Sequence, residues 1–233
     1  MNEERPLQIA IDGPAASGKT TVARGVAKKL CVLYLDTGAM YRALAYLALH
    51  TRTEADNGAA LVRLCALQPI HVMLDDAAPL GFRIFAANHE LGETLLNSNE
   101  VTAIVSTIAA HPEVREVMVQ AQRELALRTS VVMAGRDIGT VVLPAAPVKI
   151  FLTASVDARV ARRRAQLEAA GIDVDVHRLT EEIEERDRLD ASRAVAPLRP
   201  AEGAHVIDSS TKSAAQVVDE ICAIAAAAGR SPA

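Results

Sequence analysis

The stretch Gly13-Pro14-Ala15-Ala16-Ser17-Gly18-Lys19-Thr20 decides the fold of this chain. It follows an apolar run at residues 7–11 and leads into residues 21–30, whose apolar positions recur at helical spacing. The pattern GxxxxGK[ST] between a strand and a helix predicts a nucleotide phosphate-binding loop. Glycines let consecutive backbone N–H groups point at phosphate oxygens, and the following helix adds its positive N-terminal end. A strand–turn–helix joint that merely needs glycines has no use for Lys-Thr after the second one.

Each residue type of the loop has a separate task in holding a nucleoside triphosphate. Lys19 is expected to reach the β- and γ-phosphates, and the Thr20 hydroxyl to complete the shell of a Mg²⁺ ion. We therefore predict ATP and Mg²⁺ as ligands. The predicted ATP-binding residues are the loop and the residue after it: Gly13, Pro14, Ala15, Ala16, Ser17, Gly18, Lys19, Thr20 and Thr21.

Composition narrows the class of protein. The chain has 233 residues, half of them apolar, and a net charge of −4, which argues against a surface that coats a nucleic acid polymer. Its three cysteines, Cys31, Cys65 and Cys222, are widely spaced and predict buried free thiols in a reducing compartment. Residues 1–6 are polar and no apolar run approaches ~20 residues, so we expect neither a signal peptide nor a membrane span, and a cytoplasmic location.

Strand-like and helix-like segments alternate along most of the chain. This order predicts a three-layer α/β fold, which is built on a parallel sheet with right-handed crossovers between its strands. Strands are expected at residues 7–11, 32–35, 130–134, 148–152 and 204–208. Helices are expected at residues 21–30, 39–50, 51–66, 99–110, 112–127, 156–170, 180–190 and 214–228.

One region interrupts the alternation of strands and helices. Residues 70–74 and 82–85 alternate between apolar and polar side chains, with turn residues at 75–79 and 88–89. This pattern predicts a small antiparallel sheet, inserted at about residues 68–98.

The class of phosphate-loop protein follows from what surrounds the loop. The chain lacks the NKxD motif with which GTPases read guanine, and the strand that ends at Ala134-Gly135-Arg136 lacks the acidic end typical of ATP-driven motor domains. Small-molecule kinases instead spread arginines over several mobile segments, because two polyanions and the moving phosphoryl group must all be neutralised. This chain fits that third class.

The arginines stand where such a kinase needs them. Arg136 follows a buried strand, at the edge where open α/β sheets bind ligands. Arg186, Asp190 and Arg193 are spaced i, i+4, i+7 and share a face if the segment is helical. Plainer interpretations remain open for several of them. The arginines at 162–164 fit a solvated helix face, Arg186 and Asp190 an ordinary surface pair, and Asp36 a helix cap alone.

The order and spacing of these blocks resemble bacterial cytidylate kinases over about residues 7–220. The resemblance rests on residues 9–20, Leu35-Asp-Thr-Gly-Ala-Met-Tyr-Arg42, Gly135-Arg-Asp-Ile-Gly-Thr140, Arg186-Asp187 with Asp190 and Arg193, and Ala196-Pro197-Leu198. The inserted segment is similar to the small sheet that the long bacterial forms carry in their monophosphate-binding region. Two positions depart from the pattern: Ala134 replaces an acidic residue of some relatives, so no strand-end carboxylate is assigned to Mg²⁺, and Asn97 stands where a basic residue is expected.

The resemblance implies transfer of a phosphoryl group from ATP to CMP or dCMP. Arg42 and Arg136 would hold the acceptor phosphate, with Arg193 joining them, and Thr37 would help at the phosphate or ribose side. Arg186 and Asp190 would take the ribose hydroxyls. The implied CMP-binding set is Asp36, Thr37, Arg42, Ser106, Arg115, Arg136, Asp137, Arg186, Asp190 and Arg193, with Ser106, Arg115 and Asp137 reading cytosine. The implied catalytic residues are Lys19, Arg136, Arg163 and Arg193, and Arg162, Arg163 and Arg164 belong to a lid over ATP.

The implied organisation is a single monomeric kinase domain over residues 1–233. Its core covers about residues 5–35, 130–155 and 200–229, its monophosphate-binding region about 36–128, and its lid about 160–193. Two alternatives stay open, another small-molecule kinase of the shikimate or dephospho-coenzyme A type and a nucleotide-dependent switch module. Direct tests of acceptors separate the kinases, and a switch would turn over slowly and retain its nucleotide.

Overall fold

The computed structural model describes residues 6–75, 77–78, 81–169, 171–192 and 195–228. They fall into two compact units. We call Leu7–Cys31 together with residues 132–228 the phosphate-loop unit. We call Val32–Val131, with Pro6, the inserted unit.

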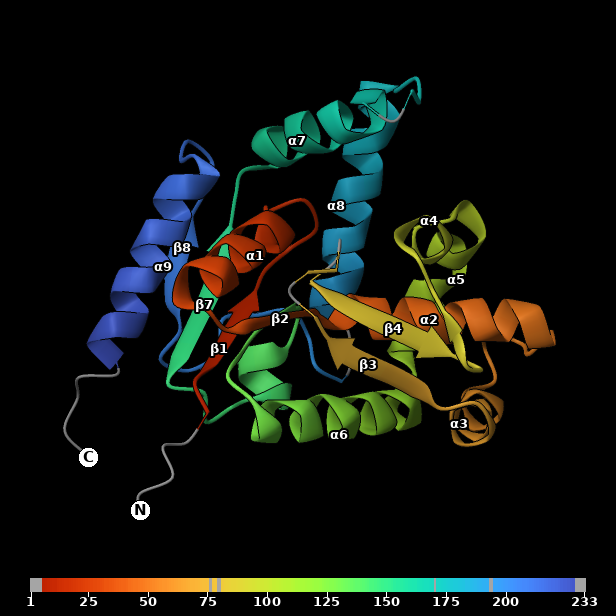
Figure 1. The fold of residues 1–233 in the computed structure, drawn as a ribbon. Coiled ribbons are helices and arrows are strands. Elements are labelled where there is room, and N and C mark those ends of the chain that lie inside the picture. The colour runs from red at the N-terminus through yellow and green to blue at the C-terminus, as the bar shows by residue number, and fades with distance from the viewer. Residues whose placement is uncertain (1–5, 76, 79–80, 170, 193–194, 229–233) are drawn as a thin grey trace, which may run out of the picture. The chain divides into compact units, whose positions relative to one another are not determined.

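The main sheet has five strands and a parallel arrangement (Figure 1). Its order is β2 (Leu33–Asp36), β6 (Val131–Gly135), β1 (Gln8–Asp12), β7 (Val148–Thr153) and β8 (His205–Asp208). In register, Ile9 of β1 lies opposite Val148 of β7, and Ile150 opposite His205 of β8. The apolar side chains of β1 and β6 are almost completely buried, which is why these strands are continuous apolar runs rather than alternating ones.

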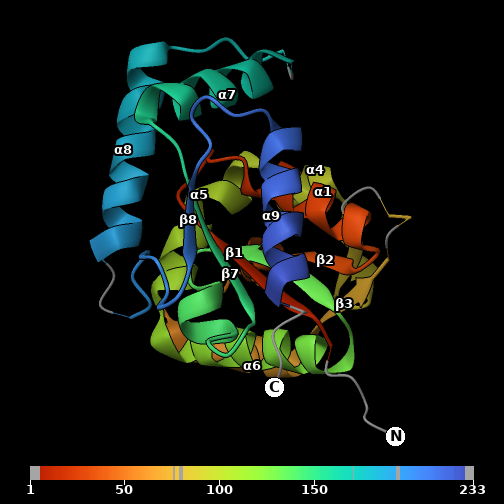
Figure 2. The same ribbon diagram turned by 90° about the vertical axis from the view of Figure 1, so that its left-hand side faces the viewer.

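Helices α1 (Lys19–Leu30) and α9 (Ala214–Ala228) lie side by side against β1 and β7 (Figure 2). They approach closely at Gly25, where an added Cβ atom would lie 2.6 Å from Cγ2 of Val218. Helices α7 (Val156–Ala169) and α8 (Val176–Ser192) pack against each other at a steep angle (Figure 2), and the small apolar cluster between them contains Val160, Leu179 and Ile183. The π-helical turn η1 (Ile138–Val142) follows β6.

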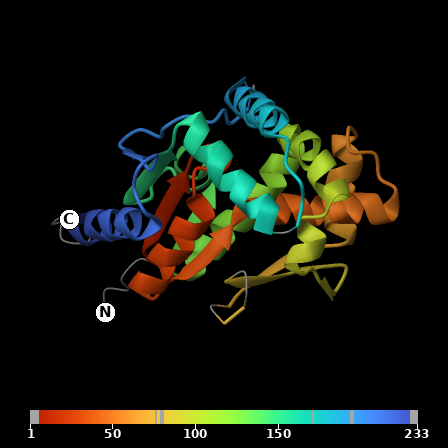
Figure 3. The same cartoon turned by 90° about the horizontal axis from the view of Figure 1, so that it is seen from above.

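The inserted unit combines helices with a small sheet. Its helices are α2 (Thr37–Thr51), α3 (Gly58–Leu67), α4 (Glu93–Leu96), α5 (Asn99–Ala110) and α6 (Pro112–Arg128). Strands β3 (Ile70–Leu74), β4 (Phe82–Ala86) and β5 (His89–Glu90) are antiparallel, with Val72 opposite Ile84 (Figure 3). Buried side chains of α2, including Met40, Leu44 and Leu47, supply much of this unit's core.

The α/β class, the parallel sheet and the inserted antiparallel sheet are confirmed. The expected helix at residues 51–66 is wrong in its start. Arg52 takes a left-handed conformation with φ 54° and ends α2, and α3 begins at Gly58 because the Asn57 side chain accepts the N–H of Ala60. Likewise α8 begins four residues before the expected Thr180, because the Asp175 carboxylate accepts the N–H groups of His177 and Arg178.

The cysteines are free, but the expectation that all three are buried is wrong. Cys222 is buried, Cys65 is half-buried, and Cys31 is exposed where α1 ends. Among the described residues, the search for a helix long and apolar enough to cross a membrane finds none.

Candidate functional site

The phosphate loop between β1 and α1 folds tightly back on the sheet. An added Cβ atom at Gly13 would lie 2.0 Å from the Leu152 carbonyl oxygen of β7, so only glycine fits. Gly18, at φ 92°, and Ala16, at φ 56°, turn the chain in the left-handed region. A non-glycine residue held there is strained by roughly 1–3 kcal/mol, and such strain concentrates at functional sites.

Lys19 lies at the first position of α1 and is buried, with 8% of its surface exposed. Its Nζ donates to the Pro14 carbonyl oxygen at 2.5 Å and lies 3.4 Å from Oγ of Ser17. Within the described part of the chain, no side chain caps the N-terminus of α1. A cation and the positive end of a helix thus meet in a curled loop, an arrangement that binds phosphate.

Two arginines of α7 contact main-chain carbonyl groups of the phosphate loop. Nη1 of Arg162 lies 3.2 Å from the Ser17 carbonyl oxygen, and its Nη2 donates to the carbonyl oxygen of Ser209, which is itself buried. Arg159, with 4% of its surface exposed, extends Nη1 to the Ala15 carbonyl oxygen at 3.4 Å. The same Nη1 atom forms an ion pair with Oδ2 of Asp187 at 2.6 Å. Main-chain carbonyl groups of the loop are therefore held by side chains of α7.

Asp12, the last residue of β1, is 2% exposed and joins the loop to the turn after β6. Its Oδ1 accepts the N–H of Ile138 and its Oδ2 the N–H of Gly139, each at 2.7 Å. Burial and, to a smaller extent, the charge of Asp137 together raise the pKa of this carboxyl to about 6. The two N–H groups and the charge of Lys19 oppose that rise.

Arg136 and Asp190 come together although 54 residues separate them. Nε of Arg136 donates to Oδ2 of Asp190 at 2.8 Å, and Asp190 is 2% exposed. Two residues that the sequence predicted for the acceptor side are thus a partly buried ion pair, which fixes the plane of the guanidinium group. Asp137, next in the chain, is 7% exposed, and Arg186 lies exposed on α8.

The remaining lid arginines lie on the surface. Arg163 is exposed, with Nη1 3.5 Å from Oε1 of Gln166, and Arg164 pairs with Glu168 one turn along α7. Arg193 lies outside the described residues. Arg162 therefore differs from its two neighbours, because it contacts the phosphate loop.

In the inserted unit, Asp36 does two things at the start of α2. Its Oδ1 accepts the N–H of Gly38 at 3.0 Å and so caps the helix, as the sequence predicted. Its Oδ2 accepts from Nη2 of Arg42 at 2.9 Å. Nε of Arg42 is buried and has no hydrogen-bond partner among the described residues. Thr37, the first residue of α2, is 4% exposed.

Arg115 is buried on α6, with its guanidinium carbon 5.7 Å from the centre of the Tyr41 ring. Its Nη1 donates to the Ala109 carbonyl oxygen at 3.3 Å. A cation over an aromatic face is held in place by the ring's charge distribution. Ser106, the other predicted base reader of this unit, lies exposed on α5.

Comparison with known proteins now gives the family. The family model described as cytidylate kinase matches residues 9–227, nearly the whole chain. This chain belongs to the cytidylate kinase family.

Individual relatives agree. A cytidylate kinase from Geobacillus sp. (strain WCH70) is 49% identical over 218 residues, which cover 94% of this chain and 96% of the relative. A second, from Anoxybacillus flavithermus, is 48% identical and covers 95% of this chain and 96% of the relative. A solved structure of an uncharacterised protein from Eubacterium ventriosum is similar in fold, with a TM-score of 0.52, 13% identity, and 96% and 99% of the two chains covered.

Sequence motifs of the cytidylate kinase family did not reveal every residue that shapes this site. Asp12, Arg159, Tyr41 and Ser209 were missed, and each acts on a predicted residue or on the loop itself. Asp12 stands in the quoted run before Gly13, but its partners lie more than 100 residues further along the chain. The contacts of the other three depend on residues that are far apart in the sequence.

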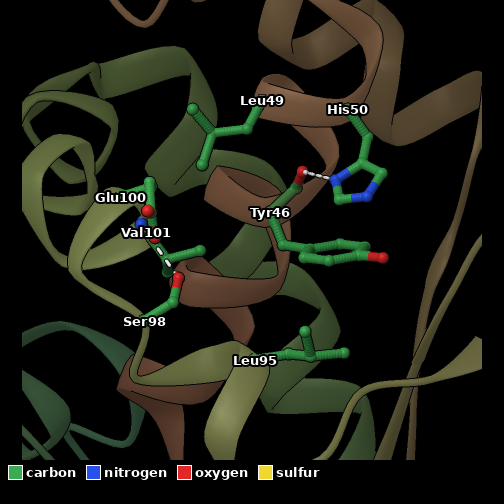
Figure 4. Close-up of a pocket in the computed structure, with 7 residues that line it drawn as sticks. All are labelled: Tyr46, Leu49, His50, Leu95, Ser98, Glu100 and Val101. Carbon is green, nitrogen blue, oxygen red and sulfur yellow. Dashed lines mark hydrogen bonds between the residues drawn. The ribbon is translucent and has the colours of Figure 1, made fainter.

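A separate hollow lies on the inserted unit of this cytidylate kinase family member, between α2 and the segment of α4 and α5 (Figure 4). The rings of Tyr46 and His50 stack there with centroids 4.0 Å apart, and Leu49 and Leu95 are partly exposed. Its lining is mostly apolar, and it includes none of the residues predicted for ATP or CMP. It plays no part in the chemistry derived below.

Proposed function

We propose that this chain transfers the γ-phosphoryl group of ATP to CMP or dCMP and forms ADP with CDP or dCDP. The observation that carries the proposal is the buried Nε of Arg42, which has no partner among the described residues. Leaving a buried donor unpaired costs about 1–3 kcal/mol, and an acceptor phosphate that takes a hydrogen bond from this nitrogen would remove that cost. Together with the phosphate loop, the chain then has one group of cationic side chains for the phosphoryl donor and another for the phosphoryl acceptor.

The donor is proposed to bind at the phosphate loop. Lys19 would leave the Pro14 carbonyl and donate to phosphate oxygens, where it neutralises charge that develops as the bond to the β–γ bridging oxygen breaks. Mg²⁺ would supply further charge neutralisation on the phosphates. The Thr20 hydroxyl, exposed at the second position of α1, fits as its single protein ligand, because Mg²⁺ retains waters and phosphate oxygens as its other ligands.

The acceptor phosphate is proposed to bind Arg42 and Arg136, with Arg193 joining them. An acceptor phosphate oxygen forms the new bond to the γ-phosphorus as ADP leaves, so both arginines face charge in the ground state and in the transition state. The carboxylates that already orient them, Asp36 and Asp190, reduce the cost of placing each guanidinium. Exposed Arg163 and Arg164 suit a lid that delivers charge only on closure.

The base is proposed to be read by Asp137, Ser106 and Arg115. Cytosine offers an amino donor at C4 with acceptors at N3 and O2, whereas uracil offers O4 and a protonated N3. A carboxylate accepts from the amino group and a guanidinium donates to the acceptors. UMP would instead place O4 against the carboxylate and leave a charged group unpaired, a cost of about 1–3 kcal/mol, which corresponds to about 5–150-fold in kcat/KM.

One assay tests the proposal. ADP release should be measured across CMP, dCMP, UMP, AMP, GMP and shikimate with ATP and Mg²⁺, and the phosphorylated product identified by chromatography. We expect turnover with CMP and dCMP well above all others. A preference for shikimate would establish another kind of kinase. Slow ATP hydrolysis with tightly retained nucleotide and no acceptor dependence would establish a switch.

A further inference from the structure

Asp12 has a placement that no step proposed above uses. It is the last residue of β1, directly before Gly13, and is 2% exposed. Both of its carboxylate oxygens accept main-chain N–H groups, those of Ile138 and Gly139, at 2.7 Å. A carboxylate with two short charge-assisted bonds is a rigid connection between its own strand and the segment that it holds.

The segment that Asp12 holds begins directly after Arg136 and Asp137. Ile138 and Gly139 are the first residues of η1, and the Asp137 carbonyl oxygen accepts the N–H of Val141 at 2.9 Å within that turn. Fixing the two N–H groups therefore fixes the main chain from which the Asp137 and Arg136 side chains extend. Arg136 has a second support in Asp190, and the main chain of Asp137 is held through the turn that follows it.

Space around this connection is limited as well. An added Cβ atom at Gly139 would lie 3.3 Å from Oδ2 of Asp12 and 3.1 Å from Cβ of Ala201. A methyl group at this position would press on the Asp12 carboxylate without removing any charge. The turn thus offers two independent ways to disturb one contact.

We propose that Asp12 is a positioning residue for base selection, which holds the Ile138–Gly139 turn so that Asp137 meets the amino group of the acceptor base. This inference rests on the proposed cytidylate kinase activity. Asp12 does not contact the base in this scheme. It acts through Asp137 and, by holding the same turn, on Arg136.

The charge around Asp12 agrees with a role that depends on its carboxylate form. Burial raises its pKa to about 6, and the charge of Lys19 opposes that rise. Near neutral pH the group is then an acceptor at both oxygens, as the two N–H groups require. An asparagine could accept from one N–H group but would direct its own NH₂ at the other.

The test compares base selection in Asp12→Asn, Gly139→Ala and Asp208→Asn, all in the full-length chain. Asp208 ends β8 and its carboxylate also accepts a main-chain N–H, that of Ser210 at 2.8 Å, so it provides a matched control at another strand end. Values of kcat/KM for CMP and UMP are measured for each variant, with ATP affinity by calorimetry and folding by thermal unfolding.

We expect Asp12→Asn to lower kcat/KM for CMP on the order of 10–100-fold and to lower the CMP-over-UMP ratio by roughly 3–10-fold. Gly139→Ala should act in the same direction to a smaller extent, and Asp208→Asn should leave the ratio unchanged. In the Asp137→Asn background, Asp12→Asn should lower the ratio no further, because both act through one group.

If Asp12 has a merely structural role, folded Asp12→Asn and Gly139→Ala should lower kcat/KM for CMP and for UMP alike. An unchanged CMP-over-UMP ratio in both variants would therefore overturn the inference. If Asp12→Asn does not fold, Gly139→Ala alone decides it by the same criterion. Failure of the proposed function is distinguishable, because wild-type enzyme would then show no preference for CMP at all.

Discussion

In the phosphate-loop unit, the ammonium group of Lys19 donates to the Pro14 carbonyl oxygen at 2.5 Å. In the inserted unit, by contrast, Nε of Arg42 is buried without a partner among the described residues, although Asp36 holds another nitrogen of the same guanidinium. The first cation is thus held by a main-chain carbonyl of its own loop, while the second is oriented by a carboxylate that leaves one of its nitrogens unpaired. On the proposed function, a nucleotide phosphate would replace the partner of Lys19 on the donor side and would supply a partner for Arg42 on the acceptor side.

The largest expected effect concerns the side that binds the phosphoryl donor. Lys19→Ala should lower kcat by on the order of 10²–10⁴, since the lysine acts on charge at the moving phosphoryl group. Steady-state kinetics with CMP measure it. Lys28→Ala, an exposed lysine in the last turn of α1, is the control and should retain activity. Near-normal turnover in a folded Lys19→Ala variant would show that Lys19 has no catalytic role.

The next effect concerns the buried carboxylate beside the loop. The pKa of Asp12 is about 6 when folded, against 3.8 ordinarily, so between about pH 4 and 6 the folded state keeps a proton that the unfolded chain releases. Its contribution to stability is therefore present below pH 4 and lost as pH rises through 6, in total about 3 kcal/mol. Urea denaturation of unliganded enzyme from pH 4 to 7.5 should show this decline, and a flatter curve for Asp12→Asn. Parallel curves would contradict the cause given for the pKa.

Arg42→Ala tests the side that is proposed to bind the phosphoryl acceptor. We expect kcat/KM for CMP to fall by on the order of 10–100-fold, with KM raised and kcat lowered, because the guanidinium binds a phosphate that also takes part in the reaction. ATP affinity in calorimetric titration should change little. Arg63→Ala, exposed on α3, serves as the control. Equal weakening of ATP and CMP binding by Arg42→Ala would abolish the contrast between the two sides.

The smallest effects compare two neighbours on α7. Arg162→Ala should destabilise the protein by about 1–3 kcal/mol, because the Ser209 carbonyl oxygen loses its arginine donor and the Ser17 carbonyl oxygen keeps only the Ser209 hydroxyl. Arg164→Ala should change stability by less than about 0.5 kcal/mol, since its pair with Glu168 is exposed. Thermal unfolding decides between them. Similar losses in both variants would mean that the loop is not held from α7.

Local chemistry made much of this molecule predictable from its sequence. The glycine pattern and the apolar strand before it gave the phosphate loop, and the period of the apolar residues gave α5 and α9 with the bounds that the structure shows. The cap at Asp36 was predictable because an aspartate before a helix can accept one of the free N–H groups of the first turn, here that of Gly38.

The unpredicted features depend on long-range contacts. Asp12 finds its partners 126 and 127 residues away, and Arg162 meets Ser17 across 145 residues, so no local pattern identifies either contact. From the sequence, Arg162 fits either a solvated helix face or a lid over ATP. In the structure its side chain contacts the phosphate loop at the Ser17 carbonyl oxygen. Helix α3 begins late for a local reason instead, because the Asn57 cap outweighs the helical pattern before it.

Base selection tests the account most directly, because it depends on the family, the turn after β6 and the chemistry of Asp137 together. The measurement is kcat/KM for CMP and for UMP in the wild type and in Asp137→Asn. We expect the wild type to prefer CMP by about 5–150-fold and the variant to narrow that preference, because an amide can turn its NH₂ group toward O4 of uracil. An unchanged ratio in an active Asp137→Asn variant would contradict the account and leave Asp137 without a role in reading the base.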